Sequence, residues 1–233
     1  MTPLKITFNL ATPFVKSGYP IHLDSLVGFC FQRHYLPLED EPDEAAIMTI
    51  LADLPFEKHE QDGDWIFKAS AIMSDAPMMH GSRFFTRRYS EMETARAAVR
   101  GDIVYGKYKP GKPLAPNALK IDTKRGSQKN ILSYYPTTEC RRLVAYCIGD
   151  KELLDEALNE WGHISHIGAK RRMGHGLIQS INIEEDTTAL TAWQKRTMPW
   201  PLCNDVVPMR CTTQNPYFDK TRAKDGYCHI EAL

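Results

Sequence analysis

The chain has 233 residues, of which 42% are hydrophobic and 25% are charged. This length fits one large domain, or one domain that carries a substantial insertion. The composition excludes a disordered chain, a collagen-like repeat and a long coiled coil. Because no apolar run reaches the length of a membrane span and no signal-peptide core follows Met1, we expect a cytoplasmic protein without membrane contact. The six scattered cysteines predict reduced thiols rather than a disulfide framework.

The formal net charge is zero, but the charges are segregated along the chain. Fourteen Lys or Arg and only five acids lie between Arg83 and Arg142, whereas residues 37–64 hold ten acids and one lysine. Such a distribution attracts a polyanion at one place and repels it at another. We therefore predict a nucleic-acid contact in the basic segment and none in the acidic one.

The first third of the chain predicts two strands, a helix and an acidic surface insertion. Residues 5–10 alternate apolar and polar side chains, as a half-buried strand does, and residues 65–72 repeat this pattern. Between them, Asp24 or Ser25 is a candidate cap for a helix that carries Leu26 to Arg33. Residues 37–64 hold too few apolar positions for an interior, and residues 45–54 predict one amphipathic surface helix there.

The rest of the chain divides into an arm, a second set of regular elements and a tail. Glycine and proline interrupt residues 80–138 repeatedly, so we expect an inserted, extended and irregular arm. A strand is predicted over 142–149, a helix over 151–164 and a strand over 177–183. Residues 187–233 predict a tail with little regular structure, whose four aromatic side chains pack on the domain: Trp193, Trp200, Tyr217 and Phe218.

The segment Gly-Ala-Lys-Arg-Arg-Met-Gly-His-Gly, residues 168–176, is the most informative stretch. Its three glycines permit positive φ and close backbone approach, and its basic side chains supply donors for a phosphodiester backbone. It lacks the spacing of a P-loop and of a dinucleotide fingerprint, so no nucleotide cofactor is expected. The alternative is a glycine-rich turn whose charges are simply solvated.

This loop, with the helix before it and the strand after it, resembles the glycine-rich loop of the RAMP superfamily of CRISPR-associated proteins. Residues 10–15, Leu-Ala-Thr-Pro-Phe-Val, and residues 20–27, Pro-Ile-His-Leu-Asp-Ser-Leu-Val, are similar to the opening of the Cas-five-like subunit of type IV CRISPR effector complexes. The resemblance implies an α+β, ferredoxin-like (RNA-recognition-motif-type) RAMP domain. Its core would comprise residues 1–79 and 139–186, with a basic thumb-like arm at 80–138 and an irregular C-terminal tail at 187–233.

The resemblance also implies the function: a subunit without catalytic activity that holds the 5′ handle of the guide RNA (crRNA) at one end of a ribonucleoprotein in antiviral or anti-plasmid defence. Its partners would be the crRNA and the backbone and large-subunit proteins of the complex. Whether it also contacts target DNA beside the adjacent motif is left open by the sequence, although the segregated charges suit such a contact. A structural subunit that contacts only proteins is one alternative. The expected RNA-binding residues are Arg87, Arg88, Lys107, Lys109, Lys112, Lys124, Arg125, Lys129, Gly168, Lys170, Arg171, Arg172, Gly174, His175 and Gly176.

A second alternative is a crRNA-processing, metal-independent endoribonuclease of the same superfamily. His163, His166 and His175 flank the loop, and with Arg171 they could supply a base, an acid and a cation at a scissile phosphate. We favour the interpretation that the first two close the end of a helix and that His175 contacts phosphate without chemistry.

Two further groups of residues are candidates for binding. The C-terminal Cys203, Cys211, Cys228 and His229 do not have the spacing of paired zinc ligands, so no metal is expected. In the arm, Phe84-Phe85 and Tyr134-Tyr135 are candidates for stacking on unpaired bases or, alternatively, for anchoring the arm.

Overall fold

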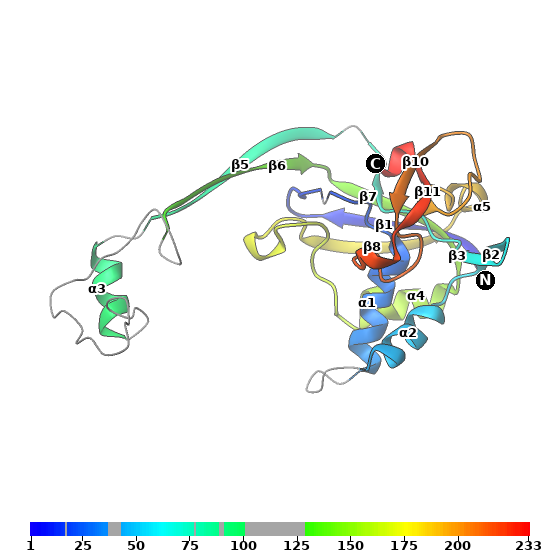
Figure 1. The fold of residues 1–233 in the computed structure, drawn as a ribbon, viewed down its shortest axis with the longest axis horizontal. Coiled ribbons are helices and arrows are strands. Elements are labelled where there is room, and N and C mark those ends of the chain that lie inside the picture. The colour runs from blue at the N-terminus through cyan, green and yellow to red at the C-terminus, as the bar shows by residue number, and fades with distance from the viewer. Residues whose placement is uncertain (17, 37–42, 77, 89–90, 101–128) are drawn as a thin grey trace. The chain divides into compact units, whose positions relative to one another are not determined.

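The computed structural model describes residues 1–233 except 17, 37–42, 77, 89–90 and 101–128 (Figure 1). The chain forms two compact units, which we describe separately. The first comprises Met1–Gly81 and Thr137–Leu233, and the second comprises Ser82–Pro136. None of the helices in the described ranges is long and apolar enough to cross a membrane. All six cysteines are free thiols, as predicted.

A four-stranded antiparallel sheet is the centre of the first unit. It contains β1 (Thr2–Leu10), β4 (Met73–Ser74), β7 (Arg142–Gly149) and β8 (Ile178–Glu185) in the order β4-β7-β1-β8. Ile6 pairs with Ala145 on one side and with Ile183 on the other. The predicted alternation in β1 is confirmed, since Leu4, Ile6 and Phe8 are fully buried.

Two helical segments connect these strands and cover one face of the sheet. The helix α1 (Leu23–Tyr35) follows β1, and α4 (Lys151–Asp155) with the π-helical turn Glu156–Glu160 follows β7. Figure 1 shows both on the same side of the sheet, together with α2 (Glu44–Ala52). Val27 and Leu154 are fully buried in one core cluster with the strand residues. Each such side chain contributes about 1.5–3 kcal/mol through burial.

Two sequence predictions for this part are corrected. The helix α1 begins at Leu23, and no side chain caps it; Asp24 lies inside its first turn and is buried. The predicted strand 65–72 ends at Phe67, since Ala69 and Ala71 form only isolated bridges. Before it, Asp62 and Gly63 form a tight turn with positive φ. This turn joins β2 (Lys58–Gln61) and β3 (Asp64–Phe67) into a separate hairpin.

The acidic insertion is less superficial than its composition predicted. Leu51, Leu54 and Phe56 are all buried, and the last two belong to the main core cluster. Residues 43–64 therefore expose their acids while their few apolar side chains close the core beside α1. Residues 37–42 lie outside the described ranges.

The segment predicted as an irregular arm contains regular structure, most of which lies in the second unit. The strands β5 (Met79–Arg87) and β6 (Ile131–Glu139) form a two-stranded sheet, and α3 (Glu91–Val99) follows β5. The prediction was wrong because aromatic side chains with high strand propensity stand beside the charged ones. Phe84 and Tyr134, for example, lie with ring centroids 6.0 Å apart.

The C-terminal segment also contains regular structure that was not predicted. It folds into α5 (Ala189–Ala192) and a sheet of β9 (Thr197–Met198), β10 (Val206–Cys211) and β11 (Lys224–His229), in the order β10-β11-β9. Short 3-10 turns lie at Lys220–Arg222 and Ile230–Ala232. Its strands lack a clear apolar alternation, since Pro208 and Gly226 interrupt them. Of the four aromatic side chains expected to pack on the domain, Trp193 is buried in a cluster with Ile66 and Ile148, whereas Phe218 is 86% exposed.

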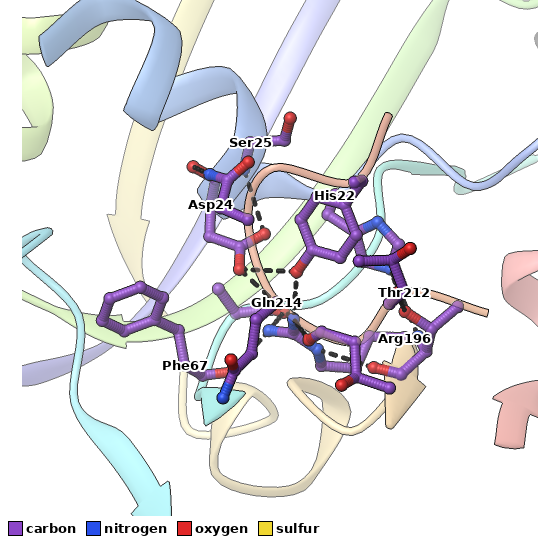
Figure 2. Close-up of polar contacts among 12 residues, drawn as sticks. His22, Asp24, Ser25, Phe67, Arg196, Thr212 and Gln214 are labelled. Atoms are coloured by element: carbon purple, nitrogen blue, oxygen red, sulfur yellow. Dashed lines mark hydrogen bonds and ion pairs between the residues drawn. The ribbon is translucent and has the colours of Figure 1, made fainter. Parts of the chain in front are cut away.

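A fully buried arginine, Arg196, connects this segment to the core through hydrogen bonds and an ion pair (Figure 2). Arg196 donates to the carbonyl oxygens of Phe67 and Ala69 at 2.6 and 2.8 Å, and its guanidinium lies 3.2 Å from the carboxylate of Asp24. Tyr217 donates to the same carboxylate at 2.7 Å. Burial raises the pKa of Tyr217, so its hydroxyl keeps the proton that it donates. We call Asp24, Arg196 and Tyr217 the buried anchor.

Candidate nucleic-acid interface

The segment 168–176, here called the glycine loop, has the backbone that its glycines predicted. Gly168, Gly174 and Gly176 have φ values of +92°, +80° and +69°, and Lys170 is also left-handed, with φ of 56°. Between them, Arg171–Met173 form a 3-10 turn. The predicted positive φ at the three glycines is therefore confirmed.

The glycine loop is held by residues 11–15, which follow β1. The amide of Gly176 donates to the carbonyl of Pro13, and the amide of Ala169 donates to that of Val15, both at 2.9 Å. The hydroxyl of Thr12 donates to the carbonyl of Gly174 at 2.8 Å and accepts from the amide of Leu177 at 2.9 Å. The two short sequence blocks that carried the resemblance thus lie in direct contact, although they are far apart in the sequence.

Two of the three glycines are also required by their surroundings. A Cβ atom at Gly176 would lie 1.9 Å from the carbonyl oxygen of Ile167, and one at Gly168 would lie 2.6 Å from that of Val15. A Cβ at Gly174 would meet nothing within 4 Å, so only its φ favours glycine there. The two ends of the loop therefore lie close to the backbone of Ile167 and of Val15.

The cations of the loop point into solvent. Lys170, Arg171 and Arg172 are exposed, and backbone hydrogen bonds from Met173 to Lys170 and from Gly174 to Arg171 hold their turn at 2.9 Å. In the part of the chain that the structure describes, the guanidinium groups of Arg171 and Arg172 have no acidic partner. A rigid turn with uncompensated guanidinium groups suits a phosphodiester backbone.

The three histidines near the loop have separate surroundings. His175 is buried, and its Nδ1 lies 3.2 Å from the carbonyl oxygen of Pro13. The Nδ1 of His166 lies 2.8 Å from the hydroxyl of its neighbour Ser165. His163 instead lies against the aromatic group of His34 and Trp161, whose rings are stacked with centroids 4.0 Å apart.

The arm residues named from the sequence are only partly described. Arg88 and Lys129 are exposed, and Arg87 donates to the carbonyl of Lys129 at 3.5 Å. The remaining predicted arm contacts lie outside the described residues: Lys107, Lys109, Lys112, Lys124 and Arg125. Base stacking by the arm aromatics stays a prediction.

Cys211 and Cys228 belong to the packed interior, whereas Cys203 is only partly buried. Burial raises the pKa of Cys228 to about 11, and burial also raises the pKa of Cys211. Over the described ranges, no group of three or more His, Cys, Asp or Glu side chains is arranged to hold a metal ion.

Sequence reasoning missed the role of Thr12 and Pro13, which hold the loop, and of the exposed Arg141 directly before β7. Pro13, three residues after the end of the alternating strand, was the available signal, because proline does not continue a strand inside a sheet. Arg141 was counted only as one charge among fourteen.

Comparison with known proteins gives one family. No curated protein matches the chain. The family model described as CRISPR type IV associated protein Csf3 matches residues 2–229, which is nearly the whole chain and includes both the loop and residues 11–15. The predicted relation to type IV CRISPR systems is thereby confirmed, and the chain belongs to the family of CRISPR type IV associated protein Csf3.

Proposed function

We propose that this chain is a non-catalytic subunit that binds the 5′ handle of crRNA in a type IV CRISPR ribonucleoprotein. The observation that carries the proposal is the glycine loop, which residues 11–15 hold rigidly while Arg171 and Arg172 stay exposed and uncompensated. Backbone contacts from such a turn position a nucleic acid without reading its sequence.

The sheet order supports a ferredoxin-like RAMP core as part of the proposal. Strand, helix, strand, strand, helix, strand is the order of β1, α1, β4, β7, α4 and β8, apart from the insertions between them. The spatial order β4-β7-β1-β8 splits each strand-helix-strand pair with another strand, as a split β-α-β unit does. RNA-recognition modules use this arrangement.

We propose no cleavage by this subunit. His175 faces a backbone carbonyl, His166 faces Ser165 and His163 lies in an aromatic group, so these contacts do not arrange a general acid beside a general base. The partners we propose are crRNA and other subunits of a cytoplasmic complex, with target DNA as a further contact of the basic segment. The charge of residues 83–142 supports contact with a polyanion.

The binding test uses the full chain, a labelled single-stranded guide RNA and a range of salt concentrations. Replacing Arg171 and Arg172 together by Gln should weaken binding and flatten the slope of log affinity against log salt by about 1.4, because each lost phosphate contact on a single strand changes it by about 0.7. Arg33→Gln, an exposed arginine on α1, is the matched control and should leave the slope unchanged. An unchanged slope in the double variant would contradict phosphate binding by the loop.

The catalytic alternative has its own test. Purified protein incubated with precursor guide RNA should leave it intact. Specific cleavage that disappears when His163, His166 and His175 are replaced by Ala would establish an endoribonuclease instead.

A further inference from the structure

An open groove of about 1310 Å³ lies in the first unit, beside the glycine loop. Its walls come from the ends of β1, β4 and β6 and from the starts of β5, β7 and β8. Thr12 and Pro13 line the groove, and the same two residues bond the glycine loop. A strand of RNA that lies on the loop therefore has this groove as its neighbouring surface.

The groove is polar but electrically balanced. Arg141 and Arg142 line it, and so do Asp75 and Glu139. Arg142 lies 3.2 Å from Asp75 in an ion pair. Because two carboxylates offset two guanidinium groups, the groove does not favour a phosphate, in contrast to the loop with its three cations.

The remaining side chains match the edges of a base. Asn9 and Ser180 both line the groove. Asn9 donates from its amide to the hydroxyl of Ser180 at 2.9 Å, and its amide oxygen can accept a further hydrogen bond. Gln179 adds an exposed amide with a donor and an acceptor side by side. Amide pairs of this kind bind the donor and acceptor edge of a purine or pyrimidine.

Arg141 supplies a planar cation to the same groove. It is exposed, and across the described residues its guanidinium has no ion pair. A guanidinium plane stacks on an unpaired base or donates two hydrogen bonds to its edge. Because the groove is open along one side, it suits one nucleotide of a polymer rather than an enclosed small molecule.

We infer that this groove binds the base of an unpaired RNA nucleotide next to the phosphates held by the glycine loop, with Arg141 and Gln179 as its main contacts and Asn9 and Ser180 as its floor. The inference rests on the proposed function. Through the groove, the first unit would recognise the base sequence of the handle, whereas the loop alone would bind any sequence.

The test measures full-chain binding to short labelled homopolymers of adenylate, cytidylate and uridylate at several salt concentrations. Arg141→Gln should reduce affinity for the preferred homopolymer roughly tenfold with an unchanged salt slope, since base contacts release no counterions. Gln179→Ala should reduce the difference in affinity between the three homopolymers. Arg33→Gln serves as the control, and circular dichroism with thermal unfolding verifies that each variant is folded.

Photocrosslinking with 4-thiouridine RNA identifies the protein residues that the bound nucleotide contacts. Crosslinks at Arg141 or at 179–180 support the groove. Crosslinks confined to residues 168–176, with wild-type affinity in Arg141→Gln, would overturn the groove and leave the proposed function standing. A flattened salt slope in Arg141→Gln would overturn base contact, and stronger competition by oligodeoxythymidylate than by RNA would overturn crRNA as the occupant. If the wild-type chain binds no RNA, the proposed function and the groove are both wrong.

Discussion

Glycines within one short loop serve different purposes, and their neighbours decide which. Gly174 needs only a left-handed backbone, because a Cβ there would enter open space. Gly176 needs both that backbone and the absence of a side chain, because the carbonyl of Ile167 occupies the space. At the scale of single residues, a side chain at Gly176 would force the backbone to move, whereas a side chain at Gly174 would only have to adopt a left-handed φ.

Gly176→Ala should thus destabilise the protein much more than Gly174→Ala. We expect about 1–2 kcal/mol for the second from left-handed φ alone, and at least about 3 kcal/mol for the first, where the backbone must also move. Urea unfolding of both variants measures the difference. Equal losses would mean that the loop relaxes away from Ile167 without cost.

At the scale of elements, the arm and the core are distinct. Among the described residues, none of the buried core side chains lies in 82–136. Gly81 and Thr137, which flank this segment, are close neighbours, since a Cβ at Gly81 would lie 3.1 Å from the hydroxyl of Thr137. A short turn can therefore join them.

Replacing residues 82–136 by a short Asn-Gly linker should leave the first unit folded, with its unfolding temperature changed by only a few degrees, about the effect of 1 kcal/mol. The same variant loses twelve Lys and Arg, so its affinity for RNA should become much less dependent on salt. Thermal unfolding and binding titrations measure the two effects. Loss of the folded state would show that the arm completes the core.

How much of these elements the sequence predicted depends on whether their signals are local. The alternation of Ile6, Phe8 and Leu10 predicted β1, and the glycines of the loop predicted their own φ, because both signals lie within a few residues. The bounds of the predicted strand 65–72 were wrong because an alternating pattern does not identify the neighbouring strand, and pairing with β2 ends at Phe67. Arg196 gave no local signal at all, because its partner Asp24 is 172 residues away. Likewise, the groove is assembled from six strand ends that only the sheet brings together.

At the scale of the whole molecule, a buried polar cluster joins the C-terminal sheet to α1. His22 stacks on Tyr217 of the buried anchor, with ring centroids 4.0 Å apart, and its Nε2 accepts from the amide of Thr197 at 3.2 Å. Burial, and then the positive charge of Arg196, lower the pKa of His22 well below its ordinary value. The neutral imidazole is therefore part of the folded state.

The folded protein should lose stability as the pH falls below about 6.5, because the unfolded chain then takes up a proton at His22 that the folded chain excludes. Between pH 6.5 and 5.5 this single group accounts for about 1 kcal/mol. His22→Gln, whose amide oxygen accepts the same hydrogen bond, should show a smaller loss over that interval. Urea unfolding at both pH values compares them; identical losses would show that His22 is not the group responsible.

The buried anchor also sets the time at which the protein can finish folding during synthesis. Asp24 leaves the ribosome 172 residues before Arg196, a delay of roughly 10–30 s at bacterial and eukaryotic elongation rates. Until then, the carboxylate of Asp24 has no cation to accompany it into the interior and must stay hydrated. The first turn of α1 therefore stays exposed to water, and β1 cannot pair with β7 and β8 until these strands have been synthesised. Nascent chains arrested before Arg196 will hold an incomplete core, which chaperones and proteases recognise by its exposed apolar surface.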